Sequence, residues 1–322
     1  MEATFYLQKY SQKIESYKKA YFTGEIKKAA RINRVAKEAL IRLRDYSTGG
    51  KCLRGVLTIL GYELAGGGNF EKVLPAAVAV ELFHNALLIH DDFIDRDSAR
   101  RGKPTVHKIY GEEGGKHYGA SMAIVVGDLA IFSANRLIAS LKLPENLVSR
   151  AVETLNGYLI DTGYGEMMDI AFDLKKEITW NDIFKVRLYK TARYTFVMPL
   201  VTGAVLGGGN KKIITNFIKY AEPVGMAFQL RDDILGIFGD PAKTGKSNDS
   251  DIKEGKKTLI FLKALELTKG TQREYLKRYY GSVDLNPERV KKIKGIIKTS
   301  GALGFSEKTS REIGRASCRE RV

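Results

Sequence analysis

The sequence has few of the residues that cross-link or interrupt a chain. Its 322 residues include two cysteines, Cys52 and Cys318, with seven prolines and one tryptophan. Two cysteines build no disulfide framework, which excludes the disulfide-rich secreted proteins. The N-terminus lacks the apolar core of a signal peptide, and the longest apolar stretch, Met122–Phe132, is interrupted by Asp128 and too short to span a bilayer. We therefore expect a cytoplasmic protein without a transmembrane segment.

Acidic residues are scarce relative to basic ones. Asp and Glu number 37 against 53 Lys and Arg, so the formal net charge is +16. Such an excess indicates an anionic partner, which can be nucleic acid, a membrane surface or a phosphorylated compound. No segment is uniformly basic and no platform of aromatic and basic residues appears, which argues against a nucleic-acid partner.

Helical periodicity dominates the sequence, with apolar residues three and four positions apart. The periodic segments are Thr4–Ala20, Gly24–Tyr46, Pro75–Asp97, Met122–Leu141, Leu147–Phe172, Thr179–Leu206, Lys211–Phe238 and Lys257–Thr268. Several are apolar nearly all round, which is typical of helices buried among other helices. The sequence predicts an all-α fold, a large single-domain helical bundle around a central apolar cavity.

A first acidic cluster, HDDFID, ends the apolar segment Pro75–Asp97. Asp91 and Asp95 are four residues apart and share one helix face, and His84 lies two turns before Asp91. Carboxylates this close repel each other unless a cation lies between them. Mg²⁺ typically binds one or two carboxylates together with substrate phosphates. The cluster therefore indicates a magnesium site.

A second acidic cluster, QLRDDILG, lies near the end of the apolar segment Lys211–Phe238. Gln229 and Asp233 are four residues apart, and Asp240 lies two turns beyond Asp233 if the helix persists. One such motif alone is equally typical of a solvated helix end. Two acidic pairs that each end a long apolar helix favour a metal-filled mouth at one end of an apolar cavity.

Basic residues gather in short motifs. The segment STGGKCLR places Lys51 and Arg54 three apart at a helix start, after a glycine pair that lets backbone N–H groups face an anion. The other basic motifs are Arg100–Thr105, Lys190–Thr191, Gly245–Lys246 and Gly255–Thr258. Together with bound metal, these cations could hold two diphosphates, one through metal bridges and one on Lys, Arg and His donors.

The motifs and their order resemble those of the trans-type polyprenyl (isoprenyl) diphosphate synthases, especially the geranylgeranyl diphosphate synthases. The matching segments are GGKCLR at Gly49–Arg54, ELFH at Glu81–His84, HDDFID at His90–Asp95, RRGKPTVH at Arg100–His107, GD at Gly127–Asp128, YKTARYTFVMPL at Tyr189–Leu200, FQLRDDILGIFGD at Phe228–Asp240 and TGK…DIKEGKKT at Thr244–Thr258. The similarity covers roughly residues 30–270.

The resemblance implies a homodimeric transferase that condenses isopentenyl diphosphate with an allylic diphosphate, head to tail, in isoprenoid biosynthesis. It assigns Mg²⁺, or Mn²⁺ in its place, to Asp91, Asp92, Asp95, Asp232, Asp233 and Asp240. It assigns the allylic diphosphate to Arg100, Lys190, Thr191, Gln229, Lys246 and Lys256. It assigns isopentenyl diphosphate to Lys51, Arg54, His84 and Arg101.

The sequence departs from the family pattern at several positions. Cys52 replaces the usual Arg, Gly55 the usual Pro, and Gly236 a frequent third Asp of the second cluster. The last eleven residues, EIGRASCRERV at Glu312–Val322, resemble a translated sequencing adapter. We expect a prenyltransferase domain over residues 1–311 that lacks its last helix, followed by a non-native tail.

Product length in this family is often set just before the first acidic cluster. The positions four and five residues before Asp91 are Leu87 and Ala86, and Phe83 lies one turn earlier. Because Ala86 is small, it leaves the cavity open at this level, which argues for a C20 product, geranylgeranyl diphosphate. Phe83, one turn further down, is a candidate for the cavity floor. The alternatives are a longer product of C25 or above, or farnesyl diphosphate. Phe83 fits ordinary core packing equally well.

Other functions fit the residues less well. A class I terpene synthase needs no second diphosphate site, so Lys51, Arg54 and His84 argue against it. A metal-dependent phosphohydrolase needs more histidines than the four present. A non-catalytic partner subunit does not explain two intact acidic clusters.

Overall fold

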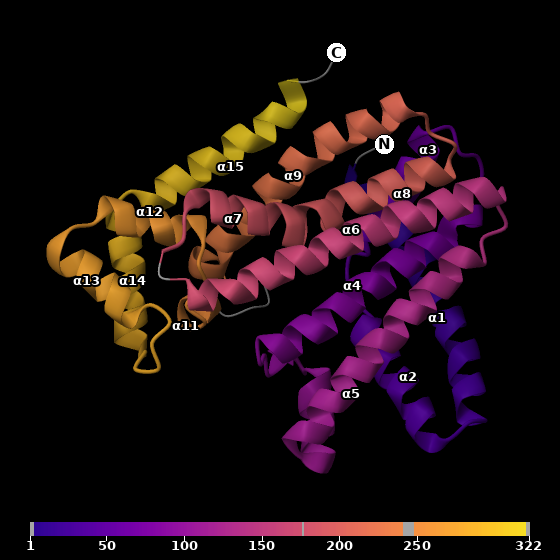
Figure 1. Cartoon of the computed structure of the whole chain (residues 1–322), viewed down its shortest axis with the longest axis horizontal. Coiled ribbons are helices and arrows are strands. Elements are labelled where there is room, and N and C mark those ends of the chain that lie inside the picture. The colour runs from indigo at the N-terminus through magenta and orange to yellow at the C-terminus, as the bar shows by residue number, and fades with distance from the viewer. Residues whose placement is uncertain (1–2, 176, 241–247, 320–322) are drawn as a thin grey trace. The chain divides into compact units, whose positions relative to one another are not determined.

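The computed structural model describes residues 3–175, 177–240 and 248–319. The described chain is helical apart from one short hairpin and the connecting segments (Figure 1). This confirms the predicted all-α class. The chain divides into two compact units, of which unit 1 contains Met1–Asn156 and Met198–Phe217, and unit 2 contains Gly157–Val197 and Ile218–Val322.

Unit 1 holds the first acidic cluster. Its elements are α1 (Ala3–Ala30), α2 (Arg34–Ser47), α3 (Leu53–Leu64), the 3₁₀-helix η1 (Phe70–Val73), α4 (Leu74–Ile94), β1 (Ala99–Arg100), β2 (Lys103–Pro104), α5 (Val106–Ala139) and α8 (Met198–Leu206). Helix α4 packs against α3 and α5, and α3 packs against α8. Most of α4 is buried because its sequence is apolar on nearly every face.

Unit 2 holds the second acidic cluster. Its elements are the 3₁₀-helix η2 (Phe172–Leu174), α7 (Trp180–Val186), the π-helix η3 (Arg187–Val197), α11 (Ser250–Lys253), α12 (Leu259–Leu267), α13 (Gly270–Tyr279), α14 (Pro287–Thr299) and α15 (Ala302–Arg319). The residues of α6 (Glu145–Ala171) and α9 (Lys211–Phe238) are divided between the two units. Side chains such as Ile237, Ile252 and Ile293 form a core in unit 2.

Several helix boundaries differ from the sequence prediction. Helix α1 continues through Gly24 to Ala30, because Phe22 and Ala29 on its apolar face are buried. The expected break at Gly111–Gly119 is a kink inside α5, where Gly115 has a φ of 85°. Helix α15 extends to Arg319 and so includes part of the segment that we expect to be a non-native tail. That expectation stays a prediction.

Two described helical stretches are long and apolar enough to cross a membrane by length and composition, Phe70–Ile94 and Val106–Ala139. In the first, 67% of the most apolar window is buried inside the protein, as in the core helix of a soluble protein. In the second, 39% is buried. Two such helices are weak evidence for a membrane protein.

Candidate active site

Helix α4 ends in a turn that reverses the chain after the first acidic cluster. Arg96 adopts a φ of 58°, and the N–H of Asp97 donates to the carbonyl of Asp92 at 2.8 Å, as in a Schellman motif. The loop Arg101–Gly102 then closes the hairpin of β1 and β2. Both loop residues have positive φ, which is the backbone of a type I′ turn and favours glycine. The hairpin returns Arg100 to the end of α4.

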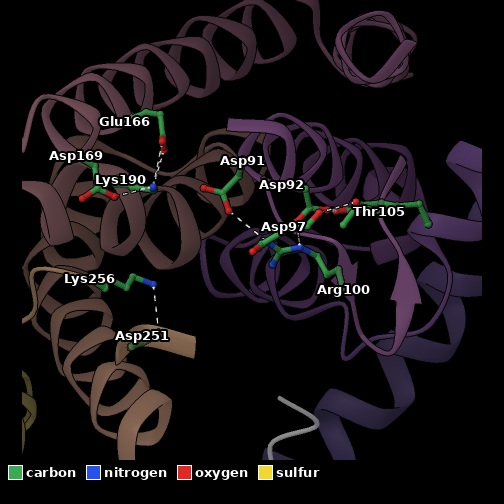
Figure 2. A network of polar contacts seen from close by, with 11 residues as sticks. Asp91, Asp92, Asp97, Arg100, Thr105, Glu166, Asp169, Lys190, Asp251 and Lys256 are labelled. Carbon is green, nitrogen blue, oxygen red and sulfur yellow. Dashed lines mark hydrogen bonds and ion pairs between the residues drawn. The ribbon is translucent and has the colours of Figure 1, made fainter. Parts of the chain in front are cut away.

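Arg100 lies among three carboxylates, two from this cluster and that of Asp97 just after it (Figure 2). Its Nε donates to Asp92, and its Nη2 lies 3.3 Å from Asp91 Oδ2 and 3.5 Å from Asp97 Oδ2. The Tyr46 hydroxyl donates to the other Asp92 oxygen at 2.6 Å. Burial raises the pKa of Asp92, and the nearby Arg100 charge only partly opposes this. Asp92, which is buried, therefore holds Arg100 in place. Asp91 also contacts Arg100 but is only partly buried.

A cavity of about 270 Å³ lies in unit 1 at the start of α3. Its lining includes all four residues predicted to bind isopentenyl diphosphate, Lys51, Arg54, His84 and Arg101. The structure therefore brings together four basic side chains that are spread over 51 positions of the sequence.

Glu81 and His84 also line this cavity, and each has a distinct role in it. Glu81 is buried, and its Oε1 accepts the backbone N–H of Gly55 at 2.8 Å, which fixes the start of α3. Burial, together with the charges of Arg54 and Arg101, lowers the pKa of His84 well below its usual value. His84 is therefore a neutral imidazole at pH 7, with one ring N–H to donate.

In unit 2, Lys190 lies between two carboxylates of α6 (Figure 2). Its Nζ lies 2.9 Å from Glu166 Oε2 and 2.8 Å from Asp169 Oδ2. Burial by itself raises the pKa of Asp169, but Lys190 and Arg187 outweigh burial, so the pKa of this carboxyl is lowered. Lys190 lies in the π-helix η3, a rare form that is frequent at functional sites.

The second acidic cluster is built around a buried ion pair. Arg187 Nε donates to Asp233 Oδ2 at 3.1 Å, and Gln229 Nε2 donates to Asp233 Oδ1 at 3.0 Å. The side chains of Arg187 and Asp233 are 4% and 3% exposed. Burial lowers the pKa of Arg187, but the carboxylates of Asp233 and Asp169 outweigh burial, so its pKa is raised overall. Asp232, the next residue in the motif, is exposed.

Asp251 and Lys256 complete this group, with Lys256 Nζ 4.0 Å from Asp251 Oδ1 (Figure 2). Burial raises the pKa of Asp251, and the charges of Asp233 and Asp232 add to that effect. For Lys256, burial lowers the pKa but Asp251 outweighs it, so the pKa is raised. In unit 2, Arg187, Lys190 and Lys256 thus each lie beside at least one carboxylate.

The donor chemistry of both clusters fits Mg²⁺. Among residues 3–175, 177–240 and 248–319, no three His, Cys, Asp or Glu side chains converge as a complete metal centre. Asp91 and Asp95 in unit 1, and Asp232 in unit 2, are carboxylates that are not fully buried. One or two hard oxygen ligands suit Mg²⁺, because this ion keeps waters and substrate phosphates as its other ligands.

The remaining predicted residues have less definite surroundings. Thr191 follows Lys190 in η3 and is partly buried, and Asp240 is exposed just beyond α9. Lys246 lies outside the described residues. Phe83 and Ala86 are 1% and 0% exposed, and Leu87 is partly buried in the same helix, α4.

Sequence reasoning missed several members of the site. Tyr46 contacts Asp92 and Arg187 contacts Asp233, and Glu81 lines the cavity with the four predicted basic residues, but the sequence did not indicate a role for these three. A signal existed for Arg187, because it precedes Lys190 by three residues and would share a helix face with it. Tyr46 offers no such signal, since its partner Asp92 is 46 residues away.

The comparisons with known proteins agree with one another. A family model described as polyprenyl synthetase matches residues 37–297. A short chain isoprenyl diphosphate synthase of Methanocaldococcus jannaschii is 35% identical over 252 residues, which is 78% of this chain and 73% of that protein. A geranylgeranyl diphosphate synthase of Sulfolobus acidocaldarius is 32% identical over 282 residues, with 87% and 80% covered.

Several solved structures are similar over almost the whole chain. One of them is a geranylgeranyl pyrophosphate synthase from Corynebacterium glutamicum in complex with isoprenyl diphosphate and magnesium. The TM-score is 0.92 at 30% sequence identity, and the match covers 97% of this chain and 92% of that one.

Proposed function

Because the chain belongs to the polyprenyl synthetase family, we propose that it condenses isopentenyl diphosphate with an allylic diphosphate, head to tail, to form geranylgeranyl diphosphate. The observation that carries this proposal is the cavity of unit 1, in which Lys51, Arg54, His84 and Arg101 converge. Three cations and a neutral imidazole N–H are suited to a diphosphate, which needs both charge and hydrogen-bond donors. A terpene synthase has no use for such a second diphosphate site.

The acidic clusters take the allylic substrate in this proposal. Each cluster would hold Mg²⁺ with its own carboxylates, Asp91 and Asp95 in unit 1 and Asp232 in unit 2, and Mg²⁺ would neutralise charge on a leaving diphosphate. Arg100 and Lys190 are each already oriented by carboxylates and would donate to the allylic diphosphate. Donors fixed in advance favour the departure of the diphosphate because they need no reorganisation during the reaction.

Apolar side chains that remain exposed support the homodimer. In unit 1, α5 exposes Ile124, Val125 and Phe132, the last to 68%. In unit 2, α6 exposes Tyr164 and Met167. Exposed apolar patches on a protein surface commonly mark protein interfaces. We propose that a second copy of the chain covers these faces. Sedimentation should then show a dimer that Phe132→Glu weakens.

The decisive experiment measures diphosphate release with isopentenyl diphosphate, an allylic primer and Mg²⁺. Turnover should require both substrates and should disappear in Asp91→Ala, because this variant removes a carboxylate of the metal site. Asp284→Ala, at an exposed position of unit 2, serves as the control and should keep full activity. Undiminished turnover in Asp91→Ala would refute the assignment.

The product defines the rest of the proposal. Chromatography of products from C5, C10 and C15 primers should give a C20 chain as the end point. A C25 or longer end point identifies a longer-chain synthase, and a C15 end point identifies a farnesyl diphosphate synthase. Product formation without isopentenyl diphosphate would instead indicate a terpene synthase. We place the enzyme in the cytoplasm, where a soluble prenyltransferase meets both substrates.

A further inference from the structure

The loop before α3, Ser47–Cys52, carries Lys51 into the cavity of unit 1. Its backbone lies in unusual regions, with φ of 81° at Gly49, 152° at Gly50 and 43° at Cys52. Glycine adopts such values easily, but a cysteine in the left-handed region is uncommon. A backbone of this kind persists when surrounding contacts over-determine it. The loop therefore needs partners that hold it.

One face of α1 supplies these partners. Ser11, Glu15 and Lys18 are spaced by four and three residues, so they share a face of the helix. Ser11 Oγ donates to the carbonyl of Lys51 at 2.6 Å. Lys18 Nζ donates to the carbonyl of Ser47 at 2.6 Å and to Glu15 Oε1 at 2.6 Å. The helix thus holds both ends of the loop.

Cys52 closes this set of contacts. Its Sγ donates to Glu15 Oε1 at 3.0 Å, so one carboxylate oxygen joins the thiol to the Lys18 ammonium. Burial raises the pKa of the Cys52 thiol, which stays neutral and donates a hydrogen bond. The arginine that is usual at this position in the family would instead add a second cation and compete with Lys18 for Glu15.

Lys18 is almost fully buried, which is unusual for a lysine. Its exposed fraction is 3%, and both Lys18 and Glu15 line the cavity with Lys51 and Arg54. Burial of an ammonium is costly unless it is paired and hydrogen-bonded. On the opposite side, Arg101 Nη1 donates to the carbonyl of Gly49 at 2.8 Å. Three carbonyls of the loop are therefore fixed by side chains from outside it.

We propose that Ser11, Glu15 and Lys18 of α1 are positioning residues for the isopentenyl diphosphate site. They hold the loop Ser47–Cys52 so that Lys51 reaches the diphosphate. The inference rests on the proposed function, because it assigns this cavity to isopentenyl diphosphate. It goes further in giving the N-terminal helix a part in substrate affinity.

The test compares Lys18→Met with Lys19→Met, which changes an exposed lysine of the same helix. Loss of a buried charged hydrogen bond should raise the KM for isopentenyl diphosphate by about tenfold or more in Lys18→Met. The KM for the allylic primer and kcat should stay within about twofold of the wild type, because the loop does not carry the allylic site. Lys19→Met should match the wild type, and Lys18→Arg should recover part of the affinity.

Ser11→Ala provides the second, milder variant and carries the test if Lys18→Met does not fold. It removes one neutral hydrogen bond and should raise the same KM by about threefold. An unchanged KM for isopentenyl diphosphate in folded Lys18→Met or Ser11→Ala would overturn the inference. Equal losses in both KM values and kcat would also overturn it, because they indicate general destabilisation. A wild-type enzyme that does not use isopentenyl diphosphate would refute the proposed function itself.

Discussion

The carboxylate of Asp251 occupies the space that a side chain on Gly236 would need. A Cβ built on Gly236 would lie 2.6 Å from Asp251 Cγ and 2.9 Å from its Oδ1. Real Cβ atoms essentially never approach other atoms this closely. The glycine therefore explains how α9 and α11 come together and how Asp251 lies near Asp233. An aspartate in place of Gly236 would require Asp251 to move.

Gly236→Ala should accordingly damage both stability and activity. In an open helix, alanine in place of glycine stabilises by about 0.5–1 kcal/mol, but here it must push away a buried carboxylate. We expect the free energy of unfolding in urea to fall by about 1–3 kcal/mol. Turnover should drop by about 10- to 100-fold, because Asp251 and Lys256 shift together.

The matched control is Gly295→Ala in α14, where a Cβ would have nothing within 4 Å. That variant should be as stable as the wild type or slightly more stable, with full activity. Gly236→Ala with the stability and turnover of Gly295→Ala would contradict the steric explanation.

The buried pair of Arg187 and Asp233 leads to a second prediction. Arg187→Met leaves the Asp233 carboxylate buried without its cation, which should cost about 3–5 kcal/mol of unfolding free energy. Arg193→Met is the control, because Arg193 also pairs with two carboxylates but its side chain is 25% exposed. Its loss should cost about 1 kcal/mol or less. Equal costs for the two variants in urea unfolding would show that Asp233 does not depend on Arg187.

The sequence predicted the parts of this protein that depend on local spacing. Apolar periodicity predicted the long helices, and the four-residue spacing of Asp91 and Asp95 placed both at the end of α4. The end of α1 was predicted wrongly, because the cost of Gly24 inside a helix is small relative to the burial of Phe22. Local propensity decides such a boundary only where packing does not.

The partners of the charged residues were beyond prediction for a different reason. Arg187 meets Asp233, and Tyr46 meets Asp92, each across 46 positions of the sequence. No periodicity links residues this far apart, since the contact depends on how helices pack. The relationship between Gly236 and Asp251 is of the same kind. In the sequence, Gly236 is only a departure from the family pattern. In the structure, the side chain of Asp251 from another helix fills the space beside Gly236.

Ala86→Tyr tests the assignment of product length. Ala86 is fully buried in α4, and a tyrosine there would fill space at the level where we expect the growing chain. The product should shorten from C20 towards C15, as measured by chromatography of the alcohols that a phosphatase releases from the product diphosphates. Val35→Tyr, at a position of α2 that is 55% exposed, should leave the product unchanged. An unaltered product distribution in Ala86→Tyr would show that Ala86 does not line the path of the chain.

The lowered pKa of His84 predicts how stability depends on pH. The folded protein keeps this imidazole neutral, because it is buried and lies near the charges of Arg54 and Arg101. The unfolded chain takes up a proton at this residue below about pH 6.5, so acid favours unfolding by up to about 1.4 kcal/mol per pH unit. The neutral imidazole therefore costs no stability above about pH 6.5, and the protein loses stability as the pH falls below that value.

His84→Asn should remove that dependence. The stability difference between the wild type and His84→Asn, measured by urea unfolding, should shift in favour of the variant as the pH falls from about 7.5 to about 5.5. His117→Asn, at an exposed position of α5, is the control and should parallel the wild type at every pH. Because carboxylates titrate in all three proteins, the comparison isolates His84. If the difference between wild type and His84→Asn stays constant over this range, His84 takes up protons equally in the folded and unfolded states. The conclusion that His84 is a neutral imidazole in the folded protein would then be wrong.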